Sequence, residues 1–422
     1  MKHLALLLCL PLAAAAIPGD DAPKPSDLID AYLGSHGDPV IVSAERGLLL
    51  EQMRGLGEAG ELTSKQAKDL ARKFEKAQKD LPQLNTKPAT IHSFYEPDLG
   101  PDGQGRYMLG GDTNKPKTLL ISLHGSGGYG DKLAKGTSPL FKPAMNRHQL
   151  AVVPNIVDRK IFWTDPAHAQ LVIDLIDASL RTFPSIDPNH VTVTGFSGGS
   201  LGSWVLGAWY ADRFGMVAPA GGGPFESSTT LGMIPNLRNT PMKIHQYEID
   251  GRMPSEHVQE AVKLMEEARA KWGGYDFEYI EHEGAGHKPP PGGMAQWIKE
   301  LPEAARIPRP TKLCWQPHID QKQQFSWLYY SGVFPGPVVV AELDTKTNSI
   351  HIEVEGDASG LSVLLDDDLL NLNKSITITV GEETVYEGKP TPQLSTIALT
   401  HLTPDPALHF TTQVDVMLRK AQ

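Results

Sequence analysis

One serine in the segment 191–204, VTVTGFSGGSLGSW, stands where an apolar, β-branched run gives way to a run of small residues. Ser197 lies between Gly195 and Gly199, in the pattern G-x-S-x-G of serines on a strained turn between a strand and a helix. The same pattern matches again around Ser200, but that position would already lie within the helix. We predict that Ser197 projects its hydroxyl as a nucleophile, with a purely structural turn as the alternative.

A serine hydroxyl needs a neighbouring base to remove its proton. The run 277–282, FEYIEH, predicts a strand, and two histidines stand near its end. His282 ends that run, whereas His287 stands in the Gly- and Pro-rich segment GAGHKPPP, 284–291. A loop can bring an imidazole over the end of the sheet, and a histidine within a strand is more restricted. We therefore predict His287 as the base, with His282 as the alternative.

The base needs an acidic residue to orient its ring. Asp250 follows the run MKIHQYEI, 242–249, and precedes a glycine and a helix start at Pro254. Glu248 would point to the same side of an extended strand and is the alternative acid. The chain order Ser197, Asp250, His287 is the order of the catalytic residues in α/β-hydrolases.

A nucleophilic serine also needs hydrogen-bond donors for the oxyanion that forms on the carbonyl. The backbone N–H of Gly198, directly after the serine, is one candidate. The segment LHGSGG, 123–128, follows another strand and offers the N–H of Ser126 or, alternatively, of Gly125. We expect His124 to order this loop. The loop is not followed by G-K-[ST], so it does not match a phosphate-binding loop.

These residues need a scaffold, and the middle of the chain predicts one. Short apolar runs alternate there with helical patterns, which is typical of buried parallel strands covered by helices on both faces. The expected strands are 117–125, 149–156, 191–195, 216–222, 242–249 and 277–282. We assign an α/β domain with a mostly parallel sheet to residues 91–301.

The N-terminal residues 1–16, MKHLALLLCLPLAAAA, have the pattern of a secretory signal peptide, which predicts a secreted or periplasmic protein. Their apolar run is too short to span a membrane, which takes ~20 residues. Residues 17–90 are expected to form a loose leader followed by a helical segment. Apolar residues at spacings of three and four predict a helix over 63–81, packed on the main domain.

The C-terminal part changes character after Leu301. Residues 302–317 contain several prolines and predict a linker. From residue 318 to 422 the pattern indicates short strands and predicts a β-sandwich-like accessory domain, which we expect to be separate from the chemistry. The expected strands are VVVAEL, SIHIEV, LSVLL, SITITV, TVYEG, STIALT and HFTTQVDVML.

Composition narrows the function classes further. The formal net charge of −11 argues against nucleic acid and anionic membrane surfaces as partners. The 15 histidines contain no H-E-x-x-H pair, so we expect neither a metal site nor a cofactor. Cleavage of the signal peptide would leave Cys314 as the sole cysteine, so we expect no internal disulfide.

The segments LHGSGG, IDPNHVTVTGFSGGSLGSW, DRFGMVAPAGGG, DGRMP and GAGH make residues 115–302 resemble a group of secreted α/β-hydrolases. This group comprises polyhydroxybutyrate-depolymerase-like and feruloyl/acetylxylan-esterase-like proteins, and it overlaps with prolyl-oligopeptidase-like hydrolases. The family often has His-Gly two or three residues before the acid, where this chain has His245-Gln246-Tyr247. The residues from Trp327 onward resemble a β-rich module attached to some such hydrolases.

The resemblance implies a secreted serine esterase with Ser197, Asp250 and His287 as its triad and with Gly198 and Ser126 holding the oxyanion. Its substrate would be a small ester or, more specifically, an acylated carbohydrate. A serine peptidase with the same triad is the second hypothesis. A polysaccharide-binding protein with an inactive hydrolase domain is the third. The oligomeric state is left open by the sequence.

Overall fold

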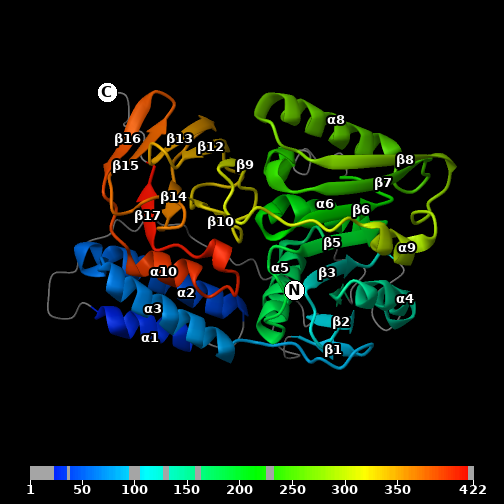
Figure 1. Cartoon of the computed structure of the whole chain (residues 1–422), viewed down its shortest axis with the longest axis horizontal. Coiled ribbons are helices and arrows are strands. Elements are labelled where there is room, and N and C mark those ends of the chain that lie inside the picture. The colour runs from blue at the N-terminus through cyan, green and yellow to red at the C-terminus, as the bar shows by residue number, and fades with distance from the viewer. Residues whose placement is uncertain are drawn as a thin grey trace, which may run out of the picture.

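The computed structural model describes residues 23–35, 39–94, 105–126, 133–156, 163–224 and 232–416. An α/β unit occupies one side of the molecule, and a β-rich unit with four helices beneath it occupies the other (Figure 1). The predicted signal peptide, residues 1–16, lies outside the described residues. Among the helices within these ranges, none has the length and apolar character needed to cross a membrane.

The α/β unit is built on an eight-stranded sheet in the order β1-β2-β4-β3-β5-β6-β7-β8. Its strands are β1 (Ile91–Ser93), β2 (Arg106–Gly111), β3 (Thr118–Leu123), β4 (Gln149–Asn155), β5 (Val191–Phe196), β6 (Met216–Ala220), β7 (Met242–Ile249) and β8 (Phe277–Ala285). From β4 to β8 all neighbours in this order are parallel, whereas β1 pairs antiparallel with β2 and β2 pairs antiparallel with β4. The mostly parallel sheet confirms the predicted α/β-hydrolase fold.

Helices cover both faces of this sheet, as the buried apolar strands require. In β3, Leu119 and Ile121 pack in the same cluster as the residues of α5 and α6, whereas Leu120 packs with Leu140 and Ile298 on the opposite face. The covering helices are α4 (Leu133–Asn146), α5 (Pro166–Thr182), α6 (Gly198–Trp209), α8 (Ser255–Trp272) and α9 (Gly293–Glu300). Short 3-10 turns η5 (Ala211–Arg213) and η6 (Ile234–Asn239) link these elements.

The C-terminal β module, residues 312–416, contains two sheets whose buried residues share one core. One sheet has the order β16-β15-β13-β12-β9 and the other β10-β11-β14-β17. The strands are β9 (Lys312–Trp315), β10 (Gln324–Phe325), β11 (Leu328–Tyr330), β12 (Val338–Asp344), β13 (Ser349–Glu355), β14 (Leu361–Leu365), β15 (Ile376–Val380), β16 (Glu383–Gly388) and β17 (Thr412–Asp415). This arrangement agrees with the predicted β-rich C-terminal unit.

Two predictions for this part of the chain are wrong. Residues 312–315 were expected in a linker, but they form β9, which pairs antiparallel with β12 and buries Trp315. The segment STIALT was expected as a strand, but it lies in helix α10 (Leu394–Thr400). Its β-branched residues favour a strand, yet Leu394, Ile397 and Ala398 share a helical face that is buried, and tertiary packing overrides local propensity.

That buried face of α10 packs against the N-terminal helices α1 (Pro25–Gly34), α2 (Pro39–Gly55) and α3 (Ser64–Ala77). Figure 1 shows these blue helices beside the red α10, below the β module. The helix predicted over 63–81 is therefore present, but it packs with α10 and not on the α/β unit. The expected loose leader is also corrected, since Leu28 and Tyr32 bury one face of α1.

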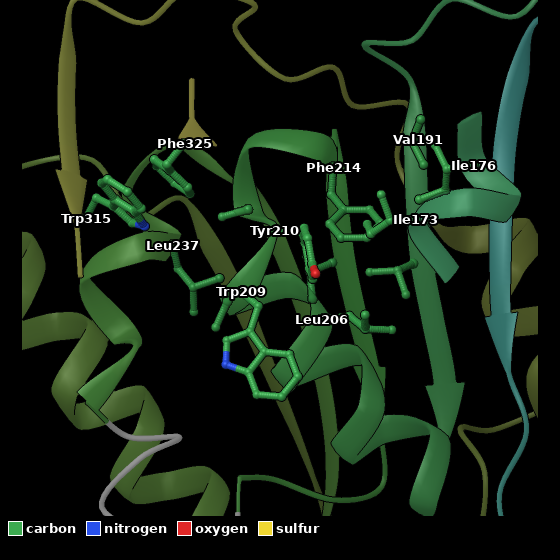
Figure 2. Close-up of a cluster of buried hydrophobic side chains, with 14 of the residues drawn as sticks. Ile173, Ile176, Val191, Leu206, Trp209, Tyr210, Phe214, Leu237, Trp315 and Phe325 are labelled. Carbon is green, nitrogen blue, oxygen red and sulfur yellow. The ribbon is translucent and has the colours of Figure 1, made fainter. Parts of the chain in front are cut away.

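The α/β unit and the β module share a continuous core. Figure 2 shows Trp315 and Phe325 of the β module in one cluster of buried side chains with Leu237 and Tyr210 of the α/β unit. The rings of Trp315 and Phe325 are stacked with centroids 5.5 Å apart. These contacts lie at the amino ends of the parallel strands, because Asp212 and Arg238 precede β6 and β7 and bond to Lys322 and Lys312. The predicted boundary between the two units is therefore a packed interface.

Candidate active site

Ser197 occupies a sharp turn between β5 and α6, as its sequence setting predicts. Its backbone has φ 61° and ψ −120°, a conformation that costs a non-glycine residue about 1–3 kcal/mol. A side chain at Gly195 would come within 2.5 Å of the Gly199 backbone, and one at Gly199 would overlap the Leu123 carbonyl oxygen. The two glycines therefore let β5, α6 and β3 approach closely enough to hold the strained serine.

The competing serine has a structural role. Ser200 is fully buried within α6, and its hydroxyl donates to the Gly222 carbonyl at 2.6 Å. The indole N–H of Trp204 donates to the same oxygen at 3.1 Å. Ser200 therefore fastens α6 to the loop after β6, and its hydroxyl is not available for attack.

His287 reaches Ser197 from the loop after β8. Its Nε2 lies 2.8 Å from the Ser197 Oγ, and its Nδ1 lies 2.8 Å from the Asp250 Oδ2. A carboxylate accepts hydrogen bonds, so Nδ1 carries the proton and Nε2 is left to accept from the serine hydroxyl. The loop is fastened by Gly286, whose N–H donates to the Ile249 carbonyl at 2.9 Å and whose φ is +143°.

Asp250 is held rigidly after β7. It is only 6% exposed, and its Oδ1 accepts the backbone N–H groups of Arg252 at 2.9 Å and Met253 at 3.0 Å. These two bonds use one carboxylate oxygen and direct the other toward His287. The three predicted residues thus form one hydrogen-bonded chain from a hydroxyl through an imidazole to a carboxylate.

The two alternative residues lie outside this chain. Glu248 is exposed, and its carboxylate accepts from the Gly284 N–H at 3.4 Å. β8 continues to Ala285, so His282 lies within the strand, where its ring packs against His245 and Tyr247 at centroid distances of 4.7 and 5.3 Å. The geometry therefore favours Asp250 and His287 over Glu248 and His282.

The predicted oxyanion donors belong to two segments, the start of α6 and the loop after β3. Gly198 opens α6, so its N–H is among those that find no acceptor within the helix. Gly125 lies against the serine, because a side chain there would come within 2.9 Å of the Phe196 carbonyl and 3.3 Å of the Ser197 Cβ. Ser126 follows it and is exposed. The structure thus keeps both Ser126 and Gly125 as candidates for the second donor.

His124 orders the loop that carries these candidates. Its Nε2 accepts the Ile156 N–H at 3.1 Å, so its Nδ1 is protonated and donates to the Gly125 carbonyl at 3.0 Å. The Trp163 indole donates to the His124 carbonyl at 2.9 Å. Burial lowers the pKa of His124 to about 4, which keeps the ring neutral in this role. His124 therefore joins the ends of β3 and β4.

One neighbour of this group has no signal in the sequence. The Phe196 ring stacks on the His287 imidazole with centroids 4.8 Å apart and an interplanar angle of 29°. Alternation along β5 could indicate which side of the strand Phe196 faces, but not that a loop far along the chain covers it. Within the described residues, no group of three or more His, Cys, Asp or Glu side chains is arranged to hold a metal ion.

Comparison with known proteins finds a partial match to one hydrolase. The chain is 40% identical over 145 residues to poly(3-hydroxyalkanoate) depolymerase C from Paucimonas lemoignei, a match that covers 29% of this chain and 33% of that protein. The resemblance to this group of hydrolases is confirmed. The match spans about a third of the relative's length. No protein-family model matches the chain.

Several solved esterases are also similar. A thermostable esterase has 20% identity and a TM-score of 0.37, covering 52% of this chain and 60% of its own. Esterase 2 from Thermogutta terrifontis has 15% identity and a TM-score of 0.38, and the match covers 52% of this chain and 93% of the esterase. The acetyl xylan esterase from Aspergillus awamori has 13% identity and a TM-score of 0.37, and the match covers 46% of this chain and 92% of the esterase.

Proposed function

We propose that this protein is an exported serine hydrolase that cleaves carboxylic esters through an acyl-enzyme on Ser197. The observation that carries the proposal is the hydrogen-bonded chain from Ser197 through His287 to Asp250, with both distances at 2.8 Å. The strained backbone of Ser197 supports it further, since strain of this kind is retained where a function requires it. Export rests on the signal-peptide pattern of residues 1–16.

The reaction proceeds in two halves. The Ser197 oxygen attacks the ester carbonyl carbon while its proton passes to the His287 Nε2, and Asp250 holds the resulting imidazolium. The N–H of Gly198 and that of Ser126, or of Gly125, stabilise the oxyanion. The imidazolium then protonates the leaving alcohol, and a water molecule activated by the same imidazole releases the acid and regenerates Ser197.

Two substrate classes follow from different observations. The residues of the site resemble those of esterases that act on acylated carbohydrates, and acyl esters on polysaccharides are our first candidate. The match to a poly(3-hydroxyalkanoate) depolymerase favours ester bonds between hydroxyacid units as the second. Activity on p-nitrophenyl esters, acetylated or feruloylated oligosaccharides, hydroxyalkanoate oligomers and peptide anilides would rank these classes and test the peptidase hypothesis.

The test of the nucleophile is Ser197→Ala in the full-length protein. This variant should lower kcat on a p-nitrophenyl ester at least ~10³-fold, the loss that follows removal of a triad member. A fluorophosphonate probe should label Ser197 in the native protein. The matched control is Ser200→Ala, which removes a structural hydroxyl and should still be labelled. Labelling at Ser200, or full activity in folded Ser197→Ala, would refute the assignment.

A further inference from the structure

The residue before the nucleophile, Phe196, makes a contact that the proposed triad does not include. Its ring lies in an offset stack on the His287 imidazole, with centroids 4.8 Å apart and planes 29° apart. Offset stacking at this distance is a favoured arrangement of aromatic rings. The half-buried Phe196 therefore covers one face of the ring that must move the proton.

A glycine close by leaves room for the Phe196 ring. Gly221, which follows β6, has φ +71°, and a side chain there would come within 2.6 Å of the Phe196 Cε2. Its N–H donates to the His245 carbonyl at 2.8 Å, which fixes the glycine against β7. The Phe196 ring thus lies close to both Gly221 and the His287 imidazole, so little space is left for it to move away from the imidazole.

We propose that Phe196 is a positioning residue that holds the His287 imidazole in the orientation facing Ser197. The face of the Phe196 ring also stabilises the protonated form of the imidazole. This inference rests on the proposed function of the triad. An aromatic face attracts a cation, and the attraction grows where water is excluded. His287 becomes a cation in each half-reaction, so the stack contributes most when the imidazole carries the transferred proton.

The groups around His287 come from three segments. Asp250, after β7, faces Nδ1, and Ser197, between β5 and α6, faces Nε2. Lys288 follows on the same loop and is exposed. Phe196 contributes the uncharged ring face. Replacing it with leucine keeps an apolar side chain of similar size, so water exclusion is retained while the aromatic face is lost.

The experiment compares Phe196→Leu and Phe196→Met with Phe196→Tyr on a soluble p-nitrophenyl ester. The two aliphatic variants should lower kcat about three- to tenfold with KM within about twofold, since only the charged form loses an interaction. The acid limb of their kcat/KM profile should move down by roughly half a pH unit, because less free energy favours the protonated imidazole. Phe196→Tyr should behave like the native protein.

Phe277→Leu is the matched control, because this partly buried ring lies at the start of β8, at the other end of the sheet from the triad. An unchanged pH profile and kcat in both aliphatic variants would overturn the inference, and so would a change confined to KM, which indicates a substrate wall. NMR titration of the His287 ring protons in Ser197→Ala, with and without Phe196→Leu, reads the same shift without catalysis. It separates failure of this inference from failure of the proposed function.

Discussion

Asp250 and Glu248 stand two residues apart at the end of β7 and differ in what surrounds them. Asp250 is buried and uses one oxygen to accept two backbone N–H groups, whereas Glu248 is exposed. The turn after β7 therefore favours Asp250 over Glu248 as the acid. This turn folds back to donate its amides, and it leaves one oxygen of Asp250 free for His287.

The same turn makes a sharp prediction for Asp250→Asn. The two backbone donors require an oxygen at Oδ1, so the amide nitrogen must face His287 and donate to its Nδ1. The imidazole then carries its proton on Nε2 and cannot accept from Ser197. We expect kcat to fall by about 10³–10⁴-fold, as a wrong tautomer implies. Glu248→Gln should stay within about twofold, and the reverse ranking in ester assays would identify Glu248 as the acid.

At the scale of elements, the site depends on close contact between β3, β5 and α6. Gly199 is where this contact is tightest, because any side chain there would overlap the Leu123 carbonyl oxygen. The parallel strands then bring their carboxyl ends to one edge of the sheet, where Gly125, Ser197, Asp250 and His287 follow β3, β5, β7 and β8. Backbone packing therefore sets the geometry of the triad.

Gly199→Ala tests this dependence. The added methyl group must push α6 away from β3, and overpacking of this kind costs about 1–3 kcal/mol of unfolding free energy. Because the shift moves the turn at Ser197, we also expect kcat to fall at least about tenfold in the folded fraction. Gly251→Ala is the control for stability, since no atom lies within 4 Å of its added methyl group. Equal denaturation midpoints for the two variants would contradict this account.

At the scale of the whole molecule, the β module and the triad lie at opposite ends of the parallel strands. The triad follows the carboxyl ends, whereas the shared core and its buried charges lie at the amino ends. Strands of six to eight residues separate the two regions by ~20 Å or more. The β module therefore packs against the amino ends of the strands and does not line the candidate active site.

Buried charged side chains stabilise the interface between the α/β unit and the β module. Arg306 bonds to Asp405 at 2.5 Å, and Arg213 bridges Asp405 and Asp177, with the guanidinium groups and Asp405 almost wholly buried. The two arginines lower the pKa of Asp405, against the effect of its burial. An ion pair of this kind is costly to break from one side, because the remaining charge stays buried without its partner.

Arg306→Met should therefore lower the unfolding free energy by about 3–5 kcal/mol. The kcat of the folded variant should be unchanged, because Arg306 lies at the end of the sheet away from Ser197. Arg72→Met is the control, since its bond to Asp69 is exposed and should contribute no more than about 1 kcal/mol. Denaturant unfolding and ester turnover measured on the same samples check both parts. A loss of kcat without a loss of stability would show that the interface acts on the site.

The candidate catalytic residues could be predicted because each is marked by a local sequence pattern. Ser197 stands between glycines at the end of a β-branched run, and Asp250 and His287 each follow an apolar strand. Their order along the chain matches a known arrangement, and parallel pairing then brings the strand ends together. The structure places these three residues within hydrogen-bonding distance. The variants described above test the catalytic roles that we assign to these residues.

The α/β sheet, the β-rich C-terminal part and the candidate triad could be predicted from the sequence, because strand alternation, glycine turns and residue order are local properties. Three features became clear only in the folded protein: α10 is a helix, residues 312–315 belong to a sheet, and α1–α3 pack on α10. The stacking of Phe196 on His287 and the position of the β module away from the site also became clear only there. Each of these depends on contacts between segments far apart in the chain, where burial outweighs local preference.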